Sequence, residues 1–457
     1  MNSETKNMTS GNSLQQIVLF FLPLLFGNLF QQVYSLVDSI IVGKGIGDKA
    51  LAAVGASGTL NFLILGFVVG LTRGFGIHFS QSFGKGDNRL LRGYVFSAQF
   101  ISTIISILFT IVCIFSLKTM LIFMSTPEDI FKDAYRYFVV ILAGILITVL
   151  NNLAITILQS LGDSKTPLRA MIISSIINII LDILFVIGFK TGVIGAAVAT
   201  VIAQAISYAF CKLQLNKVEV LMSEGNEEHS FLPDKQLSFD LLKMGLPVAF
   251  MNSVTAAGGM VLQFFVNTMG SAYVAAYSVC MKFAGLFEQF GISVGLAILT
   301  FVGQNKGAAK FDRIRKGVLQ GIGLSTVVNI PLAAILIFLP GFISSIMLSD
   351  SATIGYCTEF MPVLGISMFA LGWLFIFRYA VQGLGNTVVP MFSGFLEVAM
   401  RLLFGFTLGR MSFRGVAIAE VSAWIGAFIM LMITYFIDMK KLSHLMLTPP
   451  RKDHSNS

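Results

Sequence analysis

The chain has 457 residues, of which 55% are hydrophobic and only 12% carry a charged side chain. Soluble domains carry roughly 25% charged residues, so too few charges are present to cover a water-facing surface of this size. The mean hydropathy is +0.83. Because a membrane-spanning helix needs about 20 apolar residues, the chain has enough apolar residues for about a dozen such helices. Composition therefore predicts an all-α polytopic membrane protein. We expect the net charge of +8 to reflect the membrane topology, and we expect no nucleic-acid partner.

Apolar runs separated by glycine, proline and charged residues predict the spans. In chain order they cover 14–42, 51–80, 94–117, 134–161, 168–189, 192–213, 239–268, 272–302, 316–339, 355–383, 390–409 and 414–437. One long polar linker, 214–238, divides them into two sets of six. The sequence thus predicts an N-terminal lobe at 1–213, a C-terminal lobe at 239–437 and a polar tail at 438–457.

Lysine and arginine are distributed unequally between the two sides that these spans define. With both termini inside, 19 of the 31 basic residues fall in inner segments and 8 in outer segments. Inner loops of membrane proteins carry the excess of positive charge. The bias therefore predicts that both termini, the linker and the tail face the cytoplasm.

The two halves repeat the same landmarks at an offset of 223 or 224 residues. Three repeated landmarks are the turn Gln159-x-Leu161-Gly162-x4-Pro167 with Gln382-x-Leu384-Gly385-x4-Pro390, the pair Gln81 and Gly84 with Gln304 and Gly307, and Leu22-Pro23 with Leu246-Pro247. Because each half has an even number of spans, the lobes should be parallel and related by a pseudo-two-fold axis along the membrane normal. Such two-lobed repeats are typical of alternating-access carriers. Pro23, inside the first span, is a candidate hinge.

Polar residues that occur in only one half indicate the functional site. Asp38 lies within the first span, Asn178 and Asp182 share one face of the fifth, and Thr200 lies in the sixth; the matching positions of the second half hold no such set. Two carboxylates in hydrocarbon cost several kcal/mol unless they are paired, protonated or bound to a cation. Four oxygen-bearing groups suit a hard cation such as Na⁺. A carboxyl pair that carries a proton is the alternative, and a hydrogen-bonded brace between helices is the third reading. We prefer an ion-coupling site.

Other polar groups in the spans give weaker signals. Glu397 and Arg401, one helical turn apart, predict an internal ion pair. Further residues are candidates for lining a substrate cavity, although several could instead brace a lobe: Tyr34, Gln159, Gln263, Lys282, Glu288 and Arg378. No phosphate-binding loop is present, so neither an enzyme nor an ATP-driven pump is predicted. Energy must then come from an ion gradient, with no cofactor beyond the coupling ion.

Several short motifs resemble the multidrug and toxic compound extrusion (MATE) family over essentially all twelve spans. They are Gly27-Asn28, Val37-Asp38, Val42-Gly43, Leu51-Ala52-Ala53-Val54-Gly55 and the paired Gln-x-Leu-Gly-x4-Pro turns. The resemblance implies a monomeric antiporter of the prokaryotic plasma membrane, surrounded by membrane lipids, which exports organic and often cationic drugs as Na⁺ or H⁺ enters. Asp38, Asn178, Asp182 and Thr200 fall where the DinF-like branch has its ion site. The NorM-like branch carries an acid on its seventh span, whereas 249–260 holds no carboxylate here.

Two other functions compete with this reading. A flippase of lipid-linked oligosaccharides or lipid precursors belongs to the same superfamily and shares the two-lobed cavity, but such proteins tend towards more spans and a cationic cavity. A membrane-embedded transferase would need a constellation of histidine with serine or aspartate. The chain has only four histidines, two of them near its end.

Overall fold

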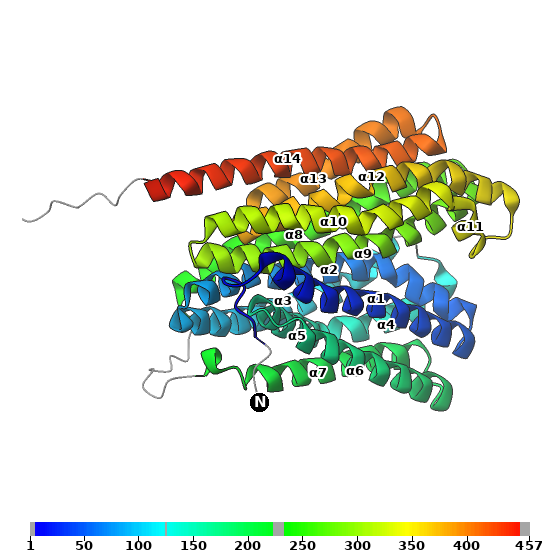
Figure 1. Ribbon diagram of the computed structural model, residues 1–457. Coiled ribbons are helices and arrows are strands. Elements are labelled where there is room, and N and C mark those ends of the chain that lie inside the picture. Colours follow the sequence, from blue (N-terminus) through cyan, green and yellow to red (C-terminus); the bar gives the residue numbers. More distant parts are fainter. Residues whose placement is uncertain (1–4, 124–125, 223–232, 448–457) are drawn as a thin grey trace, which may run out of the picture.

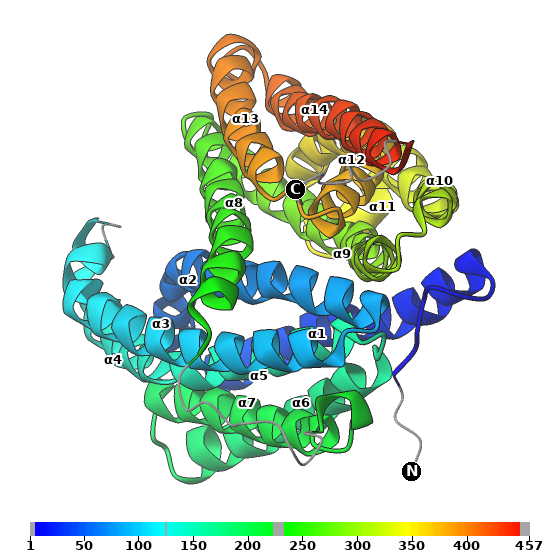
Figure 2. The ribbon, with the colours of Figure 1, turned by 90° about the vertical axis from the view of Figure 1, so that its left-hand side faces the viewer.

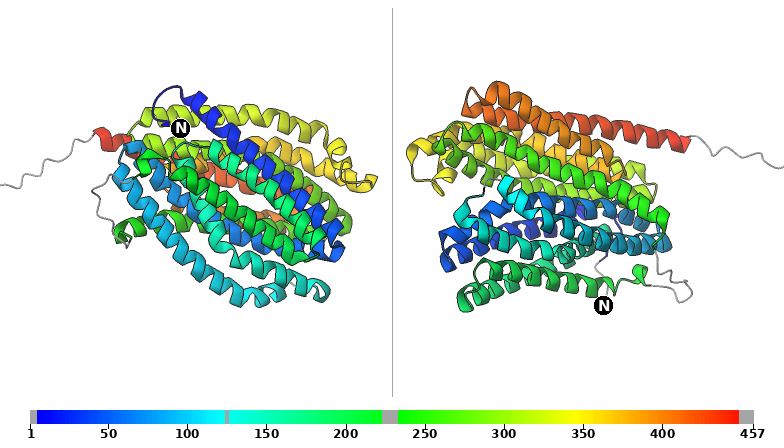
Figure 3. Two further views of the ribbon diagram at one scale, coloured as in Figure 1. Left: turned by 90° about the horizontal axis from the view of Figure 1, so that it is seen from below. Right: turned by 180° about the vertical axis from the view of Figure 1, so that it is seen from behind.

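The computed structural model describes residues 5–123, 126–222 and 233–447, and these residues are almost entirely helical. Eleven of their helices are long and apolar enough to cross a membrane, and a twelfth span results if the bent pair α4 and α5 is counted as one. The long helices run side by side along a common direction (Figures 1 and 3). The predicted fold class is therefore confirmed.

Each predicted span has a counterpart in the structure. The helices are α1 Ser13–Gly45, α2 Asp48–Lys85, α3 Asn88–Phe123, α4 Glu128–Ala143, α5 Ile145–Ser160, α6 Lys165–Asp182, α7 Val193–Leu215, α8 Lys235–Asn267, α9 Ser271–Gly307, α10 Phe311–Phe338, α11 Pro340–Ser345, α12 Ser351–Gly383, α13 Val388–Phe404 and α14 Phe413–Leu447. Two π-helical segments, η1 Ile183–Gly188 and η3 Gly405–Gly409, and a 3-10 turn, η2 Glu219–Leu221, complete the set.

The structure differs from the sequence prediction mainly at helix ends. The span predicted at 134–161 is bent by 50° between α4 and α5, where Gly144 packs directly against Val201. Helix α14 continues past residue 437 into the predicted tail, where Asp438 accepts a hydrogen bond from Asn386 Nδ2, in the α12–α13 turn, at 2.8 Å. Part of the predicted linker, 223–232, and the last part of the tail, 448–457, lie outside the described residues.

The helices form two groups that meet along α2, α8 and α9. Figure 2 shows α1 to α7 gathered on one side and α9 to α14 on the other, with α8 crossing against α2. Helices α9 and α12 form the centre of the second group, and 67% of the most apolar window of each is buried, against 22% for α3 at the edge. The central spans are therefore mostly enclosed by other helices, whereas the edge spans present apolar side chains outward.

The repeated turns have the same backbone geometry in both halves. Gly162 and Gly385 follow the last turns of α5 and α12 with φ of +80° and +82°. This left-handed conformation is readily available only to glycine, so the repeated glycine ends both helices in the same way. Pro23 and Pro247 lie inside α1 and α8, which remain continuous helices.

Candidate functional site

Two carboxyl groups face each other inside the first lobe. Asp38 on α1 and Asp182, the last residue of α6, are close enough to share a hydrogen bond. Each also has one buried oxygen, Oδ1, without a hydrogen-bond partner among the described residues. Two carboxylates in contact repel each other unless a proton or a cation neutralises one of them. The arrangement therefore requires a positively charged partner.

The two other residues predicted for this site lie beside the carboxyl pair. With its amide nitrogen turned toward Asp182, Asn178 donates to Asp182 Oδ2 at 3.2 Å and accepts from the backbone N–H of Thr200 at 3.3 Å. This orientation is assigned from the hydrogen-bond pattern. The Thr200 hydroxyl donates to the carbonyl oxygen of Ala196 at 3.1 Å, within its own helix α7. The structure thus brings all four residues together from α1, α6 and α7.

Two tyrosines complete the surroundings of the pair. Tyr34, predicted as a cavity residue, lies one helical turn before Asp38 and interacts electrostatically with both aspartates. Tyr137 on α4 is buried and does the same. Tyr137 was missed by the sequence analysis because no local motif marks it; only the packing of α4 against the site reveals it.

A π-helical segment begins directly after Asp182. Segment η1 changes the hydrogen-bond register of the α6 span immediately beyond the carboxylate, and η3 does the same in the second half, where Gly405 matches Asp182. Such π-segments are frequently found at functional sites because they rotate the following side chains relative to an α-helix. The backbone irregularity is thus repeated in both lobes, whereas the carboxylate occurs only in the first.

The remaining sequence candidates do not form one cavity. Gln159 lines a pocket between the lobes, whereas Gln263 donates to Asn267 Oδ1 on its own helix at 2.8 Å. Lys282 is exposed, and Glu288 is partly buried. Glu288 makes no hydrogen bond or ion pair that the described part of the chain shows, although its charge interacts with the ion network of the second lobe.

That network joins two arginines and two glutamates from α12, α13 and α14. Arg401 donates to Glu420 through Nε and Nη2, both at 2.8 Å. Glu397 receives the other contacts, from Arg378 Nη2 and, at 3.5 Å, from Arg401 Nη1. The predicted Glu397–Arg401 ion pair is therefore confirmed, as part of a larger cluster. All four residues are buried, so Arg378 is a member of a brace within the second lobe, and its guanidinium does not line the pocket between the lobes.

The two lobes are joined at one end of the molecule by a pair of equivalent hydrogen bonds, which we call the glutamine latch. Gln304 on α9 donates through Nε2 to the carbonyl oxygen of Ser160, and Gln81 on α2 donates through Nε2 to that of Gly383, both at 2.9 Å. Ser160 and Gly383 are the last residues of α5 and α12. The landmarks repeated in sequence therefore contact each other across the pseudo-two-fold axis.

Glycines allow this contact to be close. A Cβ atom on Gly84 would lie 1.9 Å from the carbonyl oxygen of Gln304, and one on Gly307 would lie 1.9 Å from that of Gln81. No side chain fits at either position, so the backbones of α2 and α9 touch. We call this end, where the segments predicted to be cytoplasmic converge, the closed end.

An N-terminal strap, residues 6–11, crosses the closed end from one lobe to the other. On the first lobe the backbone N–H of Lys6 donates to the carbonyl oxygen of Leu161 at 3.1 Å. On the second, the N–H of Met8 donates to Gln304 Oε1 at 2.7 Å, and Arg313 donates to the carbonyl oxygens of Met8, Ser10 and Gly11. The strap thus adds a third connection between the lobes.

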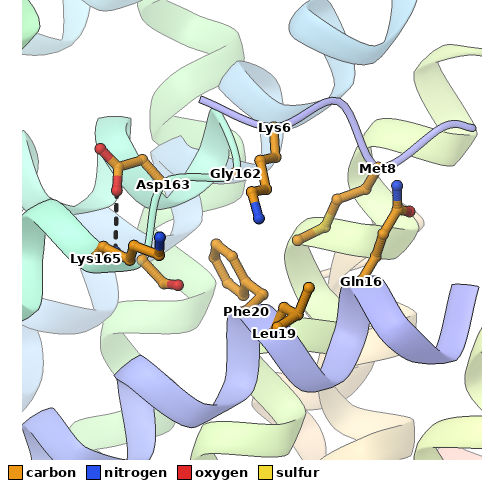
Figure 4. Close-up of a pocket in the computed structure, with 9 residues that line it drawn as sticks. Lys6, Met8, Gln16, Leu19, Phe20, Gly162, Asp163 and Lys165 are labelled. Carbon is orange, nitrogen blue, oxygen red and sulfur yellow. Dashed lines mark hydrogen bonds between the residues drawn. The ribbon is translucent and has the colours of Figure 1, made fainter. Parts of the chain in front are cut away.

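A pocket with about 390 Å³ of empty space, part of it open to solvent, lies beneath the strap. Figure 4 shows Lys6 and Met8 of the strap above Leu19 and Phe20 of α1, with Gly162 and Asp163 at the side. The Asp163 carboxylate accepts from the backbone N–H groups of residues 165 and 166 and so caps α6.

Comparison with known proteins assigns the family. The model of the MatE family matches residues 23–184 and 247–407, one stretch in each half. The chain therefore belongs to the MatE family, whose members are transporters, and the resemblance inferred from sequence is confirmed at that level. The prediction that the chain is no enzyme is confirmed by the same assignment.

The relatives and the solved structures agree with this assignment. Probable multidrug resistance protein YpnP of Bacillus subtilis is 28% identical over 308 residues, which cover 67% of this chain and 68% of YpnP. Probable multidrug resistance protein YoeA of the same organism is 26% identical over 84% of either chain. The crystal structure of MATE in the bent conformation shares the fold, with a TM-score of 0.89 at 21% identity over 96% of this chain and 98% of that one.

Proposed function

We propose that this transporter is a secondary active multidrug efflux antiporter of the DinF-like branch, coupled to an inward flow of cations at Asp38 and Asp182. The observation that carries the proposal is the facing carboxyl pair, each member with a buried oxygen that lacks a partner. A neutralising cation supplies that partner. The names of YpnP and YoeA, both described as probable multidrug resistance proteins, support drugs as the class of substrate.

The closed end supports an alternating-access mechanism for this proposal. An ion entering from outside neutralises the carboxyl pair and relaxes the repulsion between α1 and α6. Drug leaves, the glutamine latch and the strap release, and the lobes open toward the cytoplasm. An ion can shift this equilibrium only by the difference between its affinities for the two states. Asp38 lies on α1, which also contacts α9. A movement of α1 on neutralisation of the carboxyl pair is therefore transmitted directly to the second lobe.

The coupling ion that the geometry favours is H⁺. Two carboxyl groups within hydrogen-bonding reach are the arrangement of a pair that shares one proton, whereas Na⁺ would separate them by binding oxygens of both, with Asn178 and Thr200 as further ligands. In this proposal the protein works as a monomer in the cell membrane, with its closed end and both termini in the cytoplasm, and needs no other cofactor.

Efflux from everted vesicles tests the coupling site. Asp38→Asn should abolish gradient-driven movement of an organic-cation dye, because one carboxylate can no longer be neutralised and released. Asp129→Asn is the matched control, since Asp129 is an exposed carboxylate at the start of α4. Wild-type efflux by Asp38→Asn, at equal protein in the membrane, would refute the proposal.

The same vesicles identify the ion. Wild-type protein should move dye under a pH gradient alone and stay inactive under a Na⁺ gradient alone. The opposite result would replace H⁺ by Na⁺ and leave the coupling site unchanged.

A further inference from the structure

A polar pocket lies between the lobes, directly against the glutamine latch. It offers about 300 Å³ of empty space, part of it open to solvent, and its walls come from α2, α5 and α9, that is, from both lobes. The lining residues are Arg73, Gly76, Ser80, Thr156, Gln159, Ser160, Leu296, Leu299 and Thr300. One wall is thus apolar, several groups carry hydroxyls or an amide, and a single residue is charged.

That residue, Arg73, has no anionic partner. No carboxylate lines the pocket, and Arg73 forms no ion pair with any acid in the described ranges. Its one hydrogen bond is a long one, from Nη1 to the hydroxyl of Tyr379 at 3.4 Å. A guanidinium carries five N–H donors, so most of its donor capacity is unused. By contrast, the two other arginines in the interior, Arg378 and Arg401, both contact glutamates.

An unpaired cation inside the membrane region is costly and is typical of a binding pathway. The neighbouring polar groups suit an anion as well. Thr156, Gln159 and Thr300 carry hydroxyl or amide donors, and their side chains make no hydrogen bond within the described part of the protein. A carboxylate beside Arg73 would accept the guanidinium N–H groups as a bidentate pair, with these side chains as further donors and Leu296 and Leu299 against an apolar body.

We propose that this pocket binds the anionic group of an amphipathic organic substrate, a carboxylate carried by an aromatic or aliphatic body, with Arg73 as its counter-ion. The inference rests on the proposed efflux function, because it names the substrate class of that transporter. The proposal extends the expected substrate range from cationic drugs to zwitterions. The pocket binds the negative end of such a substrate, and the positive end lies outside the pocket.

The position of the pocket links the substrate to the closed end. Ser160 contributes to the pocket wall, and its carbonyl oxygen accepts the Gln304 hydrogen bond of the latch. Arg73 lies on the first lobe, and its hydrogen-bond partner Tyr379 lies on the second. When the lobes part, this wall separates, so the site exists in full only while the latch is closed.

Binding of a matched dye pair tests the proposal. Rhodamine 110 carries a free carboxylate, and rhodamine 123 is its methyl ester, so the two dyes differ only in the group that Arg73 would bind. Fluorescence anisotropy with the full-length protein in detergent at pH 7.5 should show about tenfold tighter binding of rhodamine 110. Arg73→Gln should remove this preference and leave the affinity for rhodamine 123 within twofold, and Arg73→Lys should keep part of it. Lys118→Gln, which removes an exposed positive charge on α3, is the control and should behave as wild type.

Equal affinity of the wild type for the two dyes, or failure to bind rhodamine 110, would overturn the proposal. So would an Arg73→Gln variant that loses both dyes equally, because that result indicates a structural role. If Arg73→Gln does not fold, the wild-type dye ratio and Arg73→Lys decide. The binding measurement needs no ion gradient, so it is independent of the Asp38→Asn efflux test. Either the anion pocket or the proposed efflux function can therefore be refuted while the other is supported.

A lipid phosphate could supply the same anionic chemistry. Short-chain phosphatidylglycerol and phosphatidylcholine, added as competitors, separate the two sources. Displacement of rhodamine 110 by the anionic lipid alone, in wild type and not in Arg73→Gln, supports the site and extends it to lipid headgroups. Absence of displacement supports the site for soluble carboxylates only.

Discussion

Charged side chains inside the spans fall into two kinds, according to whether opposite charges meet. In the second lobe, Arg378, Glu397, Arg401 and Glu420 bring opposite charges into contact and are buried. In the first lobe, Asp38 and Asp182 bring two like charges into contact. Opposite charges in contact neutralise one another and need no ligand, whereas like charges in contact require a proton or a cation. We therefore interpret the first kind as structural, and the second kind is the basis of the proposed coupling site.

The network predicts a large loss of stability from a single substitution. Glu420→Gln removes the charge that Arg401 binds through two 2.8 Å hydrogen bonds, and breaking a buried pair in this way costs about 3–5 kcal/mol. The apparent Tm in detergent, followed by tryptophan fluorescence, should fall strongly. Asp129→Asn breaks the exposed Lys49–Asp129 pair, worth about 0–1 kcal/mol, and serves as the control. Equal Tm values for both variants would contradict a structural role for the network.

At the scale of helices, the closed end depends on α2 and α9 touching through their backbones. The latch glutamines hold only if Gly84 and Gly307 allow that approach. Contacts between backbones tolerate no added atom, because neither partner can rotate away as a side chain can. The two glycines therefore control how completely the lobes close.

Gly84→Ala should hold the closed end apart. Nitroxide labels on Arg89→Cys and Arg315→Cys, both exposed and on opposite lobes, should report a longer or broader distance distribution by pulsed electron resonance. The four native cysteines are buried and should label slowly. Gly323→Ala is the matched control, because nothing lies within 4 Å of its added Cβ. An unchanged distribution in Gly84→Ala would show that the backbone contact is dispensable.

Helix α12 has a cap whose contribution depends on pH. The Asp350 carboxylate accepts from the hydroxyl of Thr353 at 2.6 Å and from its backbone N–H at 2.9 Å. These hydrogen bonds lower the pKa of Asp350 below its ordinary value of 3.8. Since the pKa is lower in the folded state, the cap stabilises above the unfolded-state pKa, and this stabilisation is lost as the pH falls through the folded-state pKa.

Asp350→Ala should therefore lower the Tm at pH 7 and have a smaller effect at pH 3. Thermal unfolding in detergent at the two pH values checks the difference. Asp350→Asn keeps an oxygen acceptor for the cap and should lose less. A Tm difference between Asp350→Ala and wild type that is the same at both pH values would contradict the assignment.

At the scale of the whole molecule, the fold class and the spans could be predicted because they depend on local signals. Runs of apolar residues set the helices, and the repeated Gly162 and Gly385 turns revealed the two halves before any contact was known. Asp38 and Asp182 were found because the comparison of halves exposes an acid that its counterpart lacks. Each of these signals can be read from one segment, or from two segments that are separated by the constant repeat offset.

The rest depends on packing between distant segments. Tyr137 reaches the carboxyl pair only because α4 packs beside it, and the partner of Arg401 proved to be Glu420 as well as the neighbour one turn away. Arg73 lies within the predicted span 51–80, and only the pocket shows that no acid lines the space around it. Such properties depend on which helix surfaces pack against each other, and the periodicity of residues along the sequence does not show which surfaces these are.

The N-terminal strap also sets an order for biosynthesis. Its residues are made before α9, yet Met8 binds Gln304 and Asn305, nearly 300 residues further along the chain. Until α9 and the start of α10 have been inserted, the strap can attach only to the first lobe, through Lys6. A protein made from its N-terminus therefore fastens the strap to the second lobe only after α9 and the start of α10 exist, since contacts between segments far apart in sequence form only after the later segment exists. The newly made transporter thus passes through a form with its lobes unfastened, and a truncation before residue 304 would be held in that form.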